Sequence, residues 1–457
     1  MKFSTHDIVK ATGGFLVREA APGRISTDTR SIRPGDWFLA LVGERFDGHR
    51  FLSRAAAAGA AGFIVSEEPS ADWKGGVVRV SDTTKALQNL GRLARTCVPG
   101  PTIGITGTTG KTTTRAMISC ALAAERTVHQ TAGNLNNHLG VPMTLAAIPV
   151  DATAVVLEMG TSSPGEIAFL SALANPDIRV VLNVGEGHLE ELGGLEGVAY
   201  EKGALIRDAQ PGQWVCVNLD DPFVRAMPIP AGVRTVTYGR SGDADIQLVE
   251  ATVDGDAMTT FARYQTPVGN LEICFSSPGV HLAHNGGCAL AVAHAAGIPL
   301  AGAAKGLSNY EPVGMRQRLE MIGTDIRVLN DAYNANPVSM GAALTTLSGL
   351  NGRRIAVLGD MLELGTDEER LHLSIVERAK QLSLDVVLFV GPRFAAVAQP
   401  FLNDHFQVVL DEEKAVECLS LWLRAGDTVL FKGSRGSRVE RILHTLQVNA
   451  DNSSQVK

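Results

Sequence analysis

The clearest chemical signal in the chain is a lysine followed by hydroxyl side chains, placed directly after a glycine-rich turn. The segment Thr102–Thr114 has the pattern of a buried strand, a turn and the start of a helix, with Lys111 and Thr112 at the junction. Such a turn brings backbone N–H groups against phosphate oxygens, the lysine reaches the terminal phosphates, and the hydroxyl can bind magnesium. The positive end of the helix dipole adds to the attraction. The segment therefore predicts a site for a nucleoside triphosphate.

The glycine spacing departs from the common eight-residue form of this motif. Ile105 stands where the first glycine is expected, and the glycines fall instead at Gly104, Gly107 and Gly110. An ordinary glycine-rich turn between a strand and a helix is the alternative interpretation. The apolar strand before the turn and the lysine–hydroxyl pair after it favour the phosphate site.

Two further polar residues follow apolar runs. Glu158 comes directly after the run 152–157, and His188 comes shortly after the run 178–184. Continuous apolar runs of this kind are typical of parallel strands, whose carboxyl ends meet at one edge of a sheet, where ligands bind. Glu158 is thus a candidate magnesium ligand, with capping of the following turn as the alternative. A lone histidine is more often structural, but the shared edge favours a site role for His188.

Composition limits the class of protein. At 457 residues the chain is long enough for about three domains. A net charge of -7 argues against a nucleic-acid surface. No apolar stretch reaches the ~18 residues of a membrane span, and the polar start lacks a signal-peptide core. The six cysteines are scattered without a CxxC pair, which indicates neither a zinc site nor a disulfide framework. We therefore expect a cytoplasmic protein that does not insert into a membrane.

The pattern of elements predicts an α/β protein of three domains. The first, 1–98, mixes a strand at 36–42, a helix at 51–61 ended by Gly62, and a strand at 62–66. Pro99-Gly100-Pro101 breaks the chain before the phosphate loop. The second domain, 99–312, alternates buried strands with helices at 164–173, 195–209 and 281–296, with an antiparallel extension at 244–276.

The third domain, 313–457, has the pattern of a second parallel sheet of Rossmann type. Strands are expected at 355–358, 386–390, 407–410 and 428–431, with helices between them. The polar tail, 449–457, is expected to be disordered.

The quoted residues resemble one known family. The phosphate loop, Glu158, His188 and Lys202 together resemble the Mur ligases, which join amino acids to the peptide stem of the bacterial cell-wall precursor. Asn134–Pro142 and Gly279–Asn285 resemble further signatures of this family. The similarity extends over the whole chain except the tail. It implies an N-terminal domain that binds a UDP-sugar, a central ATPase domain and a C-terminal ligase domain.

Other segments point to one branch of the family. The segments 26–30 and 43–49 resemble signatures of ligases that accept longer UDP-muramoyl peptides. The Asp-Asn-Pro-Arg motif of the ligase for the third amino acid is absent, and 358–365 and 432–435 resemble the branch that adds a dipeptide. We expect a monomer, and the sequence leaves the oligomeric state open. The resemblance implies UDP-MurNAc-tripeptide and D-Ala-D-Ala as substrates, with ATP and Mg²⁺. It does not tell whether the acceptor's third residue is diaminopimelate or lysine.

The resemblance also implies roles for individual residues. It implies catalytic roles for Lys111, Glu158, His188 and Lys202. It implies that magnesium is bound by Thr112, Glu158, His188 and Lys202. Nucleotide contacts are expected from Gly107, Thr108, Thr109, Gly110, Lys111, Thr112, Thr113, Asn285, Arg316 and Asp331. Acceptor contacts are expected from Ser26, Thr27, Arg30, Phe46, Asp47, Gly48, His49, Asn134, Asn136 and Asn137. Asp360 and the loop 432–435 are weaker candidates to face the dipeptide.

Lys202 has two interpretations. It aligns with a lysine that several family members carry as a carbamate, whose anionic oxygens can hold magnesium. The alternative is a solvated helix lysine.

Rival functions are a third-residue Mur ligase, a folylpolyglutamate synthetase and a regulatory P-loop NTPase. The first 98 residues argue against the synthetase, which lacks a UDP-sugar domain, and no Asn-Lys-x-Asp motif supports a GTPase. A non-catalytic amino-sugar-binding protein would leave Lys111, Glu158 and His188 unexplained.

Overall fold

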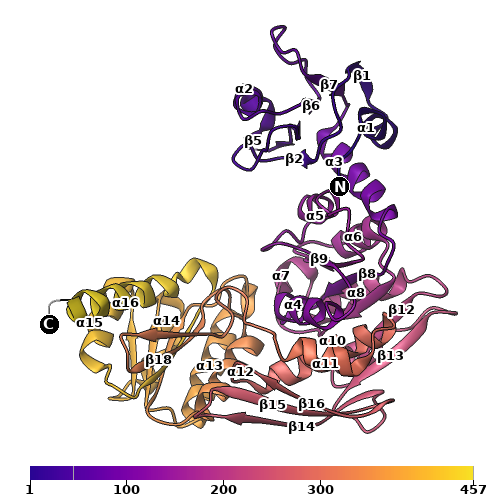
Figure 1. Cartoon of the computed structure of the whole chain (residues 1–457). Coiled ribbons are helices and arrows are strands. Elements are labelled where there is room, and N and C mark those ends of the chain that lie inside the picture. The colour runs from indigo at the N-terminus through magenta and orange to yellow at the C-terminus, as the bar shows by residue number, and fades with distance from the viewer. Residues whose placement is uncertain (45, 456–457) are drawn as a thin grey trace.

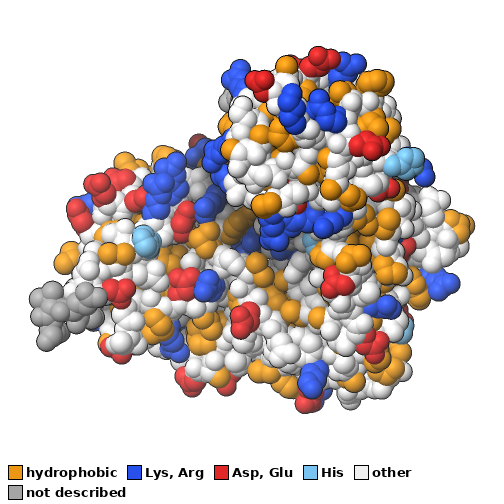
Figure 2. All heavy atoms as spheres, turned by 45° about the horizontal axis from the view of Figure 1, so that its top comes forward, with side chains coloured by type: hydrophobic (Ala, Val, Ile, Leu, Met, Phe, Trp, Pro, Cys, Tyr) orange, Lys and Arg blue, Asp and Glu red, His pale blue; other side chains and the backbone are white. Residues whose placement is uncertain are grey.

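The chain folds around three main β-sheets, each covered by its own helices (Figure 1). The structure, a computed structural model, describes residues 1–44 and 46–455. The N-terminal unit stands apart from the C-terminal one, and the central unit lies between them (Figure 1). The surface below the N-terminal unit is hollowed, and Lys and Arg side chains gather in this hollow (Figure 2). The predicted α/β class with three sheet-bearing units is confirmed.

The N-terminal sheet has five strands in the order β1-β7-β6-β3-β2. They are β1 (Phe15–Arg18), β2 (Ile25–Ser26), β3 (Trp37–Leu39), β6 (Gly62–Val65) and β7 (Gly76–Arg79), and only β1 runs antiparallel to its neighbour. A small hairpin of β4 (Val42–Gly43) and β5 (Phe46–Asp47) follows β3. Helices α1 (Thr5–Thr12), α2 (Leu52–Ala57) and α3 (Thr83–Thr96) complete this unit.

The predicted end of the helix at 51–61 is wrong. Helix α2 already ends at Ala57, and Gly62 is the first residue of β6. Gly59 has φ +90°, a backbone conformation that glycine adopts without steric cost, so the chain leaves the helix there.

The central sheet has nine strands in the order β16-β15-β14-β13-β12-β11-β8-β10-β9. The strands are β8 (Thr102–Thr106), β9 (Val128–Gln130), β10 (Ala154–Glu158), β11 (Ile178–Val181), β12 (Trp214–Asn218), β13 (Arg234–Gly239), β14 (Ile246–Asp254), β15 (Thr259–Thr266) and β16 (Gly269–Phe275). The first six are parallel, and β14, β15 and β16 pair antiparallel, as predicted for 244–276.

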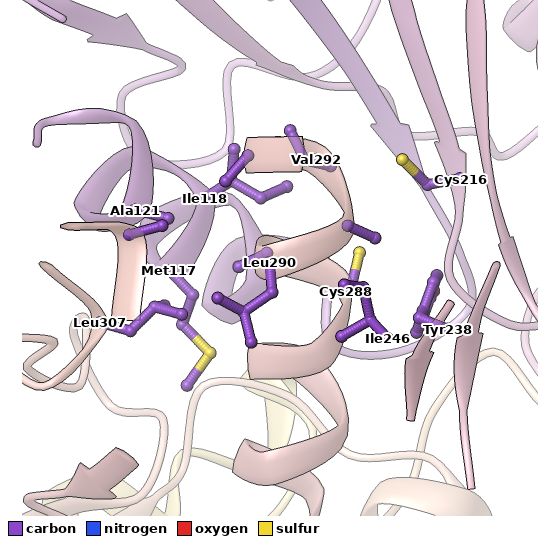
Figure 3. Close-up of a cluster of buried hydrophobic side chains, with 14 of the residues drawn as sticks. Met117, Ile118, Ala121, Cys216, Tyr238, Ile246, Cys288, Leu290, Val292 and Leu307 are labelled. Carbon is purple, nitrogen blue, oxygen red and sulfur yellow. The ribbon is translucent and has the colours of Figure 1, made fainter. Parts of the chain in front are cut away.

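Helices cover both faces of this sheet. Helices α4 (Lys111–Leu122), α10 (Val280–Ala295) and α11 (Leu300–Leu307) share one core cluster with the sheet. Figure 3 shows Met117 and Ile118 of α4 close to Leu290 of α10 in this cluster. The second cluster involves α5 (Gly140–Ala146), α6 (Glu166–Ala174), α7 (Leu189–Leu192), α8 (Leu195–Arg207) and α9 (Pro222–Arg225). Burial on both faces explains why the parallel strands are continuous apolar runs.

The C-terminal sheet has six strands in the order β17-β18-β22-β19-β20-β21. They are β17 (Arg318–Ile322), β18 (Ile326–Asp331), β19 (Arg354–Gly359), β20 (Val386–Val390), β21 (Phe406–Val409) and β22 (Thr428–Lys432), all parallel except β17. The helices are α12 (Pro337–Ser348), α13 (Glu368–Gln381), α14 (Pro392–Ala398), α15 (Glu412–Trp422) and α16 (Val439–Gln455). The four predicted strands are confirmed to within one residue at each end.

The predicted disorder of the tail is wrong for the residues that the structure describes. Helix α16 continues through Gln455, while Val456 and Lys457 lie outside the described residues. The core-facing residues Ile442, Leu443 and Leu446 anchor the helix, and helix extension past an anchored turn adds one backbone hydrogen bond per residue.

Candidate functional site

A cleft of about 810 Å³ opens between the central and C-terminal units. It is lined by the residues that follow β8, β10 and β11 on one side and β18 on the other, so the carboxyl edges of two parallel sheets meet there. Of the predicted site residues, those in the cleft lining are Thr108, Thr109, Gly110, Lys111, Thr112, Thr113, Asn134, Asn136, Asn137, Glu158, His188, Asn285, Arg316 and Asp331.

The phosphate loop takes the backbone conformation that its glycines predict. Gly107 and Gly110 have φ of +156° and +80°. Gly110 is the N-cap residue of α4, so no N-cap side chain accepts a hydrogen bond from the first N–H groups of the helix. Lys111 Nζ lies 2.6 Å from the carbonyl oxygen of Gly107, so the lysine folds back over the loop. Burial lowers the pKa of Lys111, against the opposing effect of Glu158. Asn285 stands beside the loop, since a Cβ built on Gly110 would lie 3.4 Å from its Oδ1.

Asn183 braces this loop, a role that the motifs do not predict. Its Oδ1 accepts hydrogen bonds from the backbone N–H groups of Thr108 and Thr109, at 3.0 and 2.9 Å. Its amide nitrogen donates to the carbonyl oxygen of Thr109 at 3.2 Å. Its position just after β11, at the same sheet edge as Lys111, is the only sequence signal that marks it.

Glu158 is buried at the end of β10, with 3% of its surface exposed. The Thr112 hydroxyl donates to its Oε2 at 2.8 Å and the Asn136 amide donates to its Oε1 at 3.0 Å, while an Arg115 nitrogen lies 3.5 Å from Oε2. The turn-cap alternative is therefore wrong, because the side chain points to the phosphate loop. A hydroxyl and a carboxylate this close form an oxygen donor set that fits Mg²⁺, which takes one or two carboxylates together with substrate phosphates.

His188 reaches the cleft from the N-terminus of α7, with a left-handed backbone at φ +57°. Its Nδ1 lies 3.7 Å from Oε2 of Glu363, a residue of the C-terminal unit. Burial lowers the pKa of His188, against the opposing effect of Glu363. His188 and Glu363 thus face each other across the cleft from the two units.

Lys202 lies in α8 and is 3% exposed, so the solvated-lysine interpretation is wrong. Burial and the nearby charge of Lys111 lower the pKa of Lys202 to about 7. No carboxylate lies within ion-pair distance of its ammonium in the described part of the chain. The adjacent Glu201 instead accepts hydrogen bonds from the backbone N–H groups of Gly165 and Ile167 at the start of α6.

The C-terminal side of the cleft carries its own charged groups. The Arg316 guanidinium lies over the Tyr333 ring at 3.7 Å from the centroid. Asp331 Oδ2 accepts a hydrogen bond from Lys432 Nζ at 2.6 Å, and both side chains are largely buried. The contact with Lys432 fixes the Asp331 carboxylate at the carboxyl end of β18.

Asp360 does not face the cleft. Its carboxylate is buried and accepts hydrogen bonds from the backbone N–H groups of Arg393 and Phe394, so it caps α14. Ser434 is likewise buried and joins two loops, since its hydroxyl donates to the carbonyl oxygen of Ala335 and accepts from the N–H of Leu362. Within the 432–435 loop, Lys432 is the residue that lines the cleft.

The predicted acceptor contacts of the first unit lie outside this cleft. Ser26 is the last residue of β2, and Thr27 and Arg30 follow it. Phe46 and Asp47 form β5, with Gly48 and His49 directly after it. Because β2 and β3 are parallel, the two segments continue from the same carboxyl edge of the N-terminal sheet. His49 Nδ1 lies 2.7 Å from Asp47 Oδ1, and His49 Nε2 accepts from the N–H of Ser66. Gly48 packs so closely that a Cβ would lie 2.8 Å from Leu41 backbone atoms.

Comparisons with known proteins agree with this arrangement. Three family models match the chain in order: the Mur ligase family catalytic domain at 23–95, the Mur ligase middle domain at 105–293, and the Mur ligase glutamate ligase domain at 317–435. A curated relative from Bacillus subtilis is 36% identical over 433 residues, which cover 92% of each chain. It is named UDP-N-acetylmuramoyl-tripeptide--D-alanyl-D-alanine ligase, as is an Escherichia coli relative at 33% identity over 93% of this chain and 94% of the relative.

This chain belongs to the Mur ligase family. Among solved structures, MurF from Acinetobacter baumannii aligns with a TM-score of 0.88 and 29% identity, covering 98% of this chain and 99% of that one. MurF ligase from Thermotoga maritima, solved in complex with ADP, aligns with a TM-score of 0.82 and 28% identity, covering 94% and 98%. A folylpolyglutamate synthase from Mycobacterium tuberculosis shares the fold at 19% identity, with a TM-score of 0.62 over 80% of this Mur ligase and 94% of the synthase.

Within residues 1–44 and 46–455, every helix is too short or too polar to span a bilayer.

Lys111→Ala is expected to lower the rate of ATP-dependent turnover by about 10³, because it removes the charge that meets the phosphates. The measurement is phosphate release, with circular dichroism to show that the fold is kept. Lys305→Ala removes an exposed lysine of α11 and is the matched control. Near-normal activity in a folded Lys111→Ala protein would exclude the phosphate-loop assignment.

Asn183→Ala is expected to weaken nucleotide binding by about 10-fold, because the Thr109 N–H loses its acceptor and the Thr108 N–H keeps only the backbone oxygen of residue 183 at 3.2 Å. The dissociation constant for ADP, measured by calorimetry, reports this effect without turnover. Asn309→Ala changes an exposed amide and is the control. If both variants bind ADP like the unmutated chain, Asn183 does not brace the loop.

Proposed function

We propose that this chain is an ATP-dependent ligase that joins D-alanyl-D-alanine to UDP-N-acetylmuramoyl-tripeptide and forms the pentapeptide precursor of peptidoglycan. The observation that carries the proposal is the phosphate loop with Glu158 in a cleft that faces the C-terminal unit. The names of relatives that align over more than nine-tenths of the chain support the choice of substrates.

The reaction requires activation of a carboxylate, which is itself a poor electrophile. The γ-phosphoryl group of ATP passes to the acceptor carboxylate, and the amine of the dipeptide then attacks the resulting acyl phosphate with release of phosphate. Catalysis of phosphoryl transfer is largely positioning and electrostatic stabilisation. We expect the phosphates to bind the Lys111 ammonium and the N–H groups at the start of α4, which no N-cap side chain satisfies.

Magnesium fits the oxygen donors of Thr112 and Glu158, which lie 2.8 Å apart. When bound, it would neutralise phosphate charge next to Lys111. His188 is a proposed ligand of a second metal ion or a contact of the acceptor carboxylate. ATP itself is supported by the solved Thermotoga maritima relative in complex with ADP.

Lys202 is proposed to act as a carbamate. Carbamate formation needs a neutral amine, and burial brings the pKa of Lys202 to about 7. The charge of Lys111 disfavours the protonated form of Lys202. An anionic carbamate at Lys202 would instead be attracted to the Lys111 ammonium.

We further propose that 1–98, 99–312 and 313–457 act as three domains. The first binds the acceptor, the second binds ATP and the third binds the dipeptide. The acceptor's UDP-sugar would contact the carboxyl edge of the N-terminal sheet, and its peptide would reach Asn134, Asn136 and Asn137 in the cleft. Closure of the outer domains on the central one assembles such sites. A monomeric chain in the cytoplasm remains our prediction.

Phosphate release is expected to require ATP, UDP-MurNAc-tripeptide and D-Ala-D-Ala together. The assay omits each substrate in turn and replaces the dipeptide with single amino acids. Equal turnover with a free amino acid, or with a shorter UDP-muramoyl peptide, would contradict the assignment.

Lys202→Ala is expected to lose most activity and to regain part of it with formate or acetate, since a small carboxylate can take the place of the carbamate oxygens. Lys305→Ala should show neither effect. Bicarbonate depletion should also lower the activity of the unmutated enzyme. Full activity of Lys202→Ala, or no response to acids and bicarbonate, would exclude the carbamate.

A further inference from the structure

Four carboxylates line the cleft among the residues that the structure describes, and three of them are held by neighbouring groups. Glu158 accepts hydrogen bonds from two side chains of the central unit. Glu166 accepts from two backbone N–H groups at 2.6 and 2.9 Å. Asp331 is paired with Lys432 at 2.6 Å. Each of these three carboxylates therefore already has partners within the protein.

Glu363 is the fourth carboxylate, and it is free to meet a ligand. Its side chain is 65% exposed, and the one basic side chain within 4 Å of it in the described chain is His188, at 3.7 Å. That separation exceeds hydrogen-bond distance. Its backbone has φ +63°, an uncommon conformation for a residue other than glycine. Strain of this kind persists where the surrounding structure fixes it, and it clusters at functional sites.

The segment that carries Glu363 is held firmly in the C-terminal unit. The N–H of Met361 donates to His372 Nε2 at 3.0 Å, and the N–H of Leu362 donates to the Ser434 hydroxyl at 2.9 Å. Leu364 is buried in the core of this unit. The carboxylate of Glu363 is thus presented to the cleft from a fixed support, opposite His188 and the phosphate loop.

An amine substrate needs such a group. The dipeptide enters as an ammonium ion, and the cleft already holds the positive charges of Lys111 and Arg316. The other three carboxylates of the cleft already have partners, so Glu363 is the one whose negative charge can attract the ammonium past these cations. We propose that Glu363 binds the ammonium group of the incoming D-Ala-D-Ala and positions its nitrogen. Once the ammonium has lost a proton to solvent, the neutral amine attacks the acyl carbon, and phosphate leaves. This assignment rests on the proposed function and adds a substrate-binding residue to it.

The test compares Glu363→Gln with the unmutated enzyme in steady-state kinetics. Loss of one charge-assisted hydrogen bond should raise the KM for D-Ala-D-Ala by about 10- to 100-fold. The KM values for ATP and UDP-MurNAc-tripeptide should stay within about twofold. Glu363→Asp keeps the charge and should recover part of the loss. Glu369→Gln makes the same change on an exposed residue of α13 outside the cleft lining and is the control.

A second readout separates ammonium binding from activation of the acceptor. Hydroxylamine is a small neutral nucleophile that converts an acyl phosphate to a hydroxamate and phosphate, without the dipeptide. Glu363→Gln should form hydroxamate as fast as the unmutated enzyme. D-Lactoyl-D-alanine, which carries a hydroxyl in place of the ammonium, should inhibit both proteins with the same constant.

The possible results separate failure of the ammonium site at Glu363 from failure of the proposed ligase function. If the unmutated enzyme shows no turnover that depends on D-Ala-D-Ala, the proposed function fails and this assignment fails with it. If that turnover is present but Glu363→Gln behaves like Glu369→Gln, only the ammonium site is wrong. If Glu363→Gln slows hydroxamate formation as much as dipeptide ligation, the residue acts through His188 and not on the amine.

Discussion

The structure depends on holding a lysine ammonium and a set of backbone N–H groups at the end of a buried strand, ready for phosphate. Lys111 lies against loop carbonyl oxygens, and its pKa is lowered by burial. Such a concentration of positive potential is costly without a counter-charge nearby. Glu158 supplies part of it, and Asn183 orders the loop with a neutral oxygen that adds no charge.

The same electrostatic constraint explains the positions of the other charged groups. Lys202 is buried near Lys111, where a protonated amine is disfavoured and an anionic carbamate would be favoured. On the opposite wall, Lys432 is neutralised by Asp331, and Glu363 brings a negative charge towards His188. Both walls of the cleft therefore carry charges of both signs, and Glu363 is the carboxylate on the C-terminal wall that has no hydrogen-bond partner among the described residues.

Packing gives this arrangement its rigidity. Helices α4 and α10 share one core with the central sheet, so the helix that begins at Lys111 cannot shift without disturbing a dense apolar cluster. The carboxyl edges of two parallel sheets face each other across the cleft, and each sheet is fixed by its own buried strands. Function then depends on the short loops between these edges.

The sequence by itself determined the α/β class, the buried strands and the phosphate loop, because apolar runs, glycines and a lysine–hydroxyl pair are local signals. It also marked Glu158 and His188, since each follows a strand. Local patterns were misleading where neighbours decide the outcome: Gly59 and not Gly62 ends α2, and α16 extends through a polar segment. Only the tertiary structure showed that Lys202 is buried, that Asp360 caps a helix, and that Asn183 and Glu363 reach the site. Burial, charge pairing and approach across a cleft depend on residues far apart in the chain, and no local pattern carries that information.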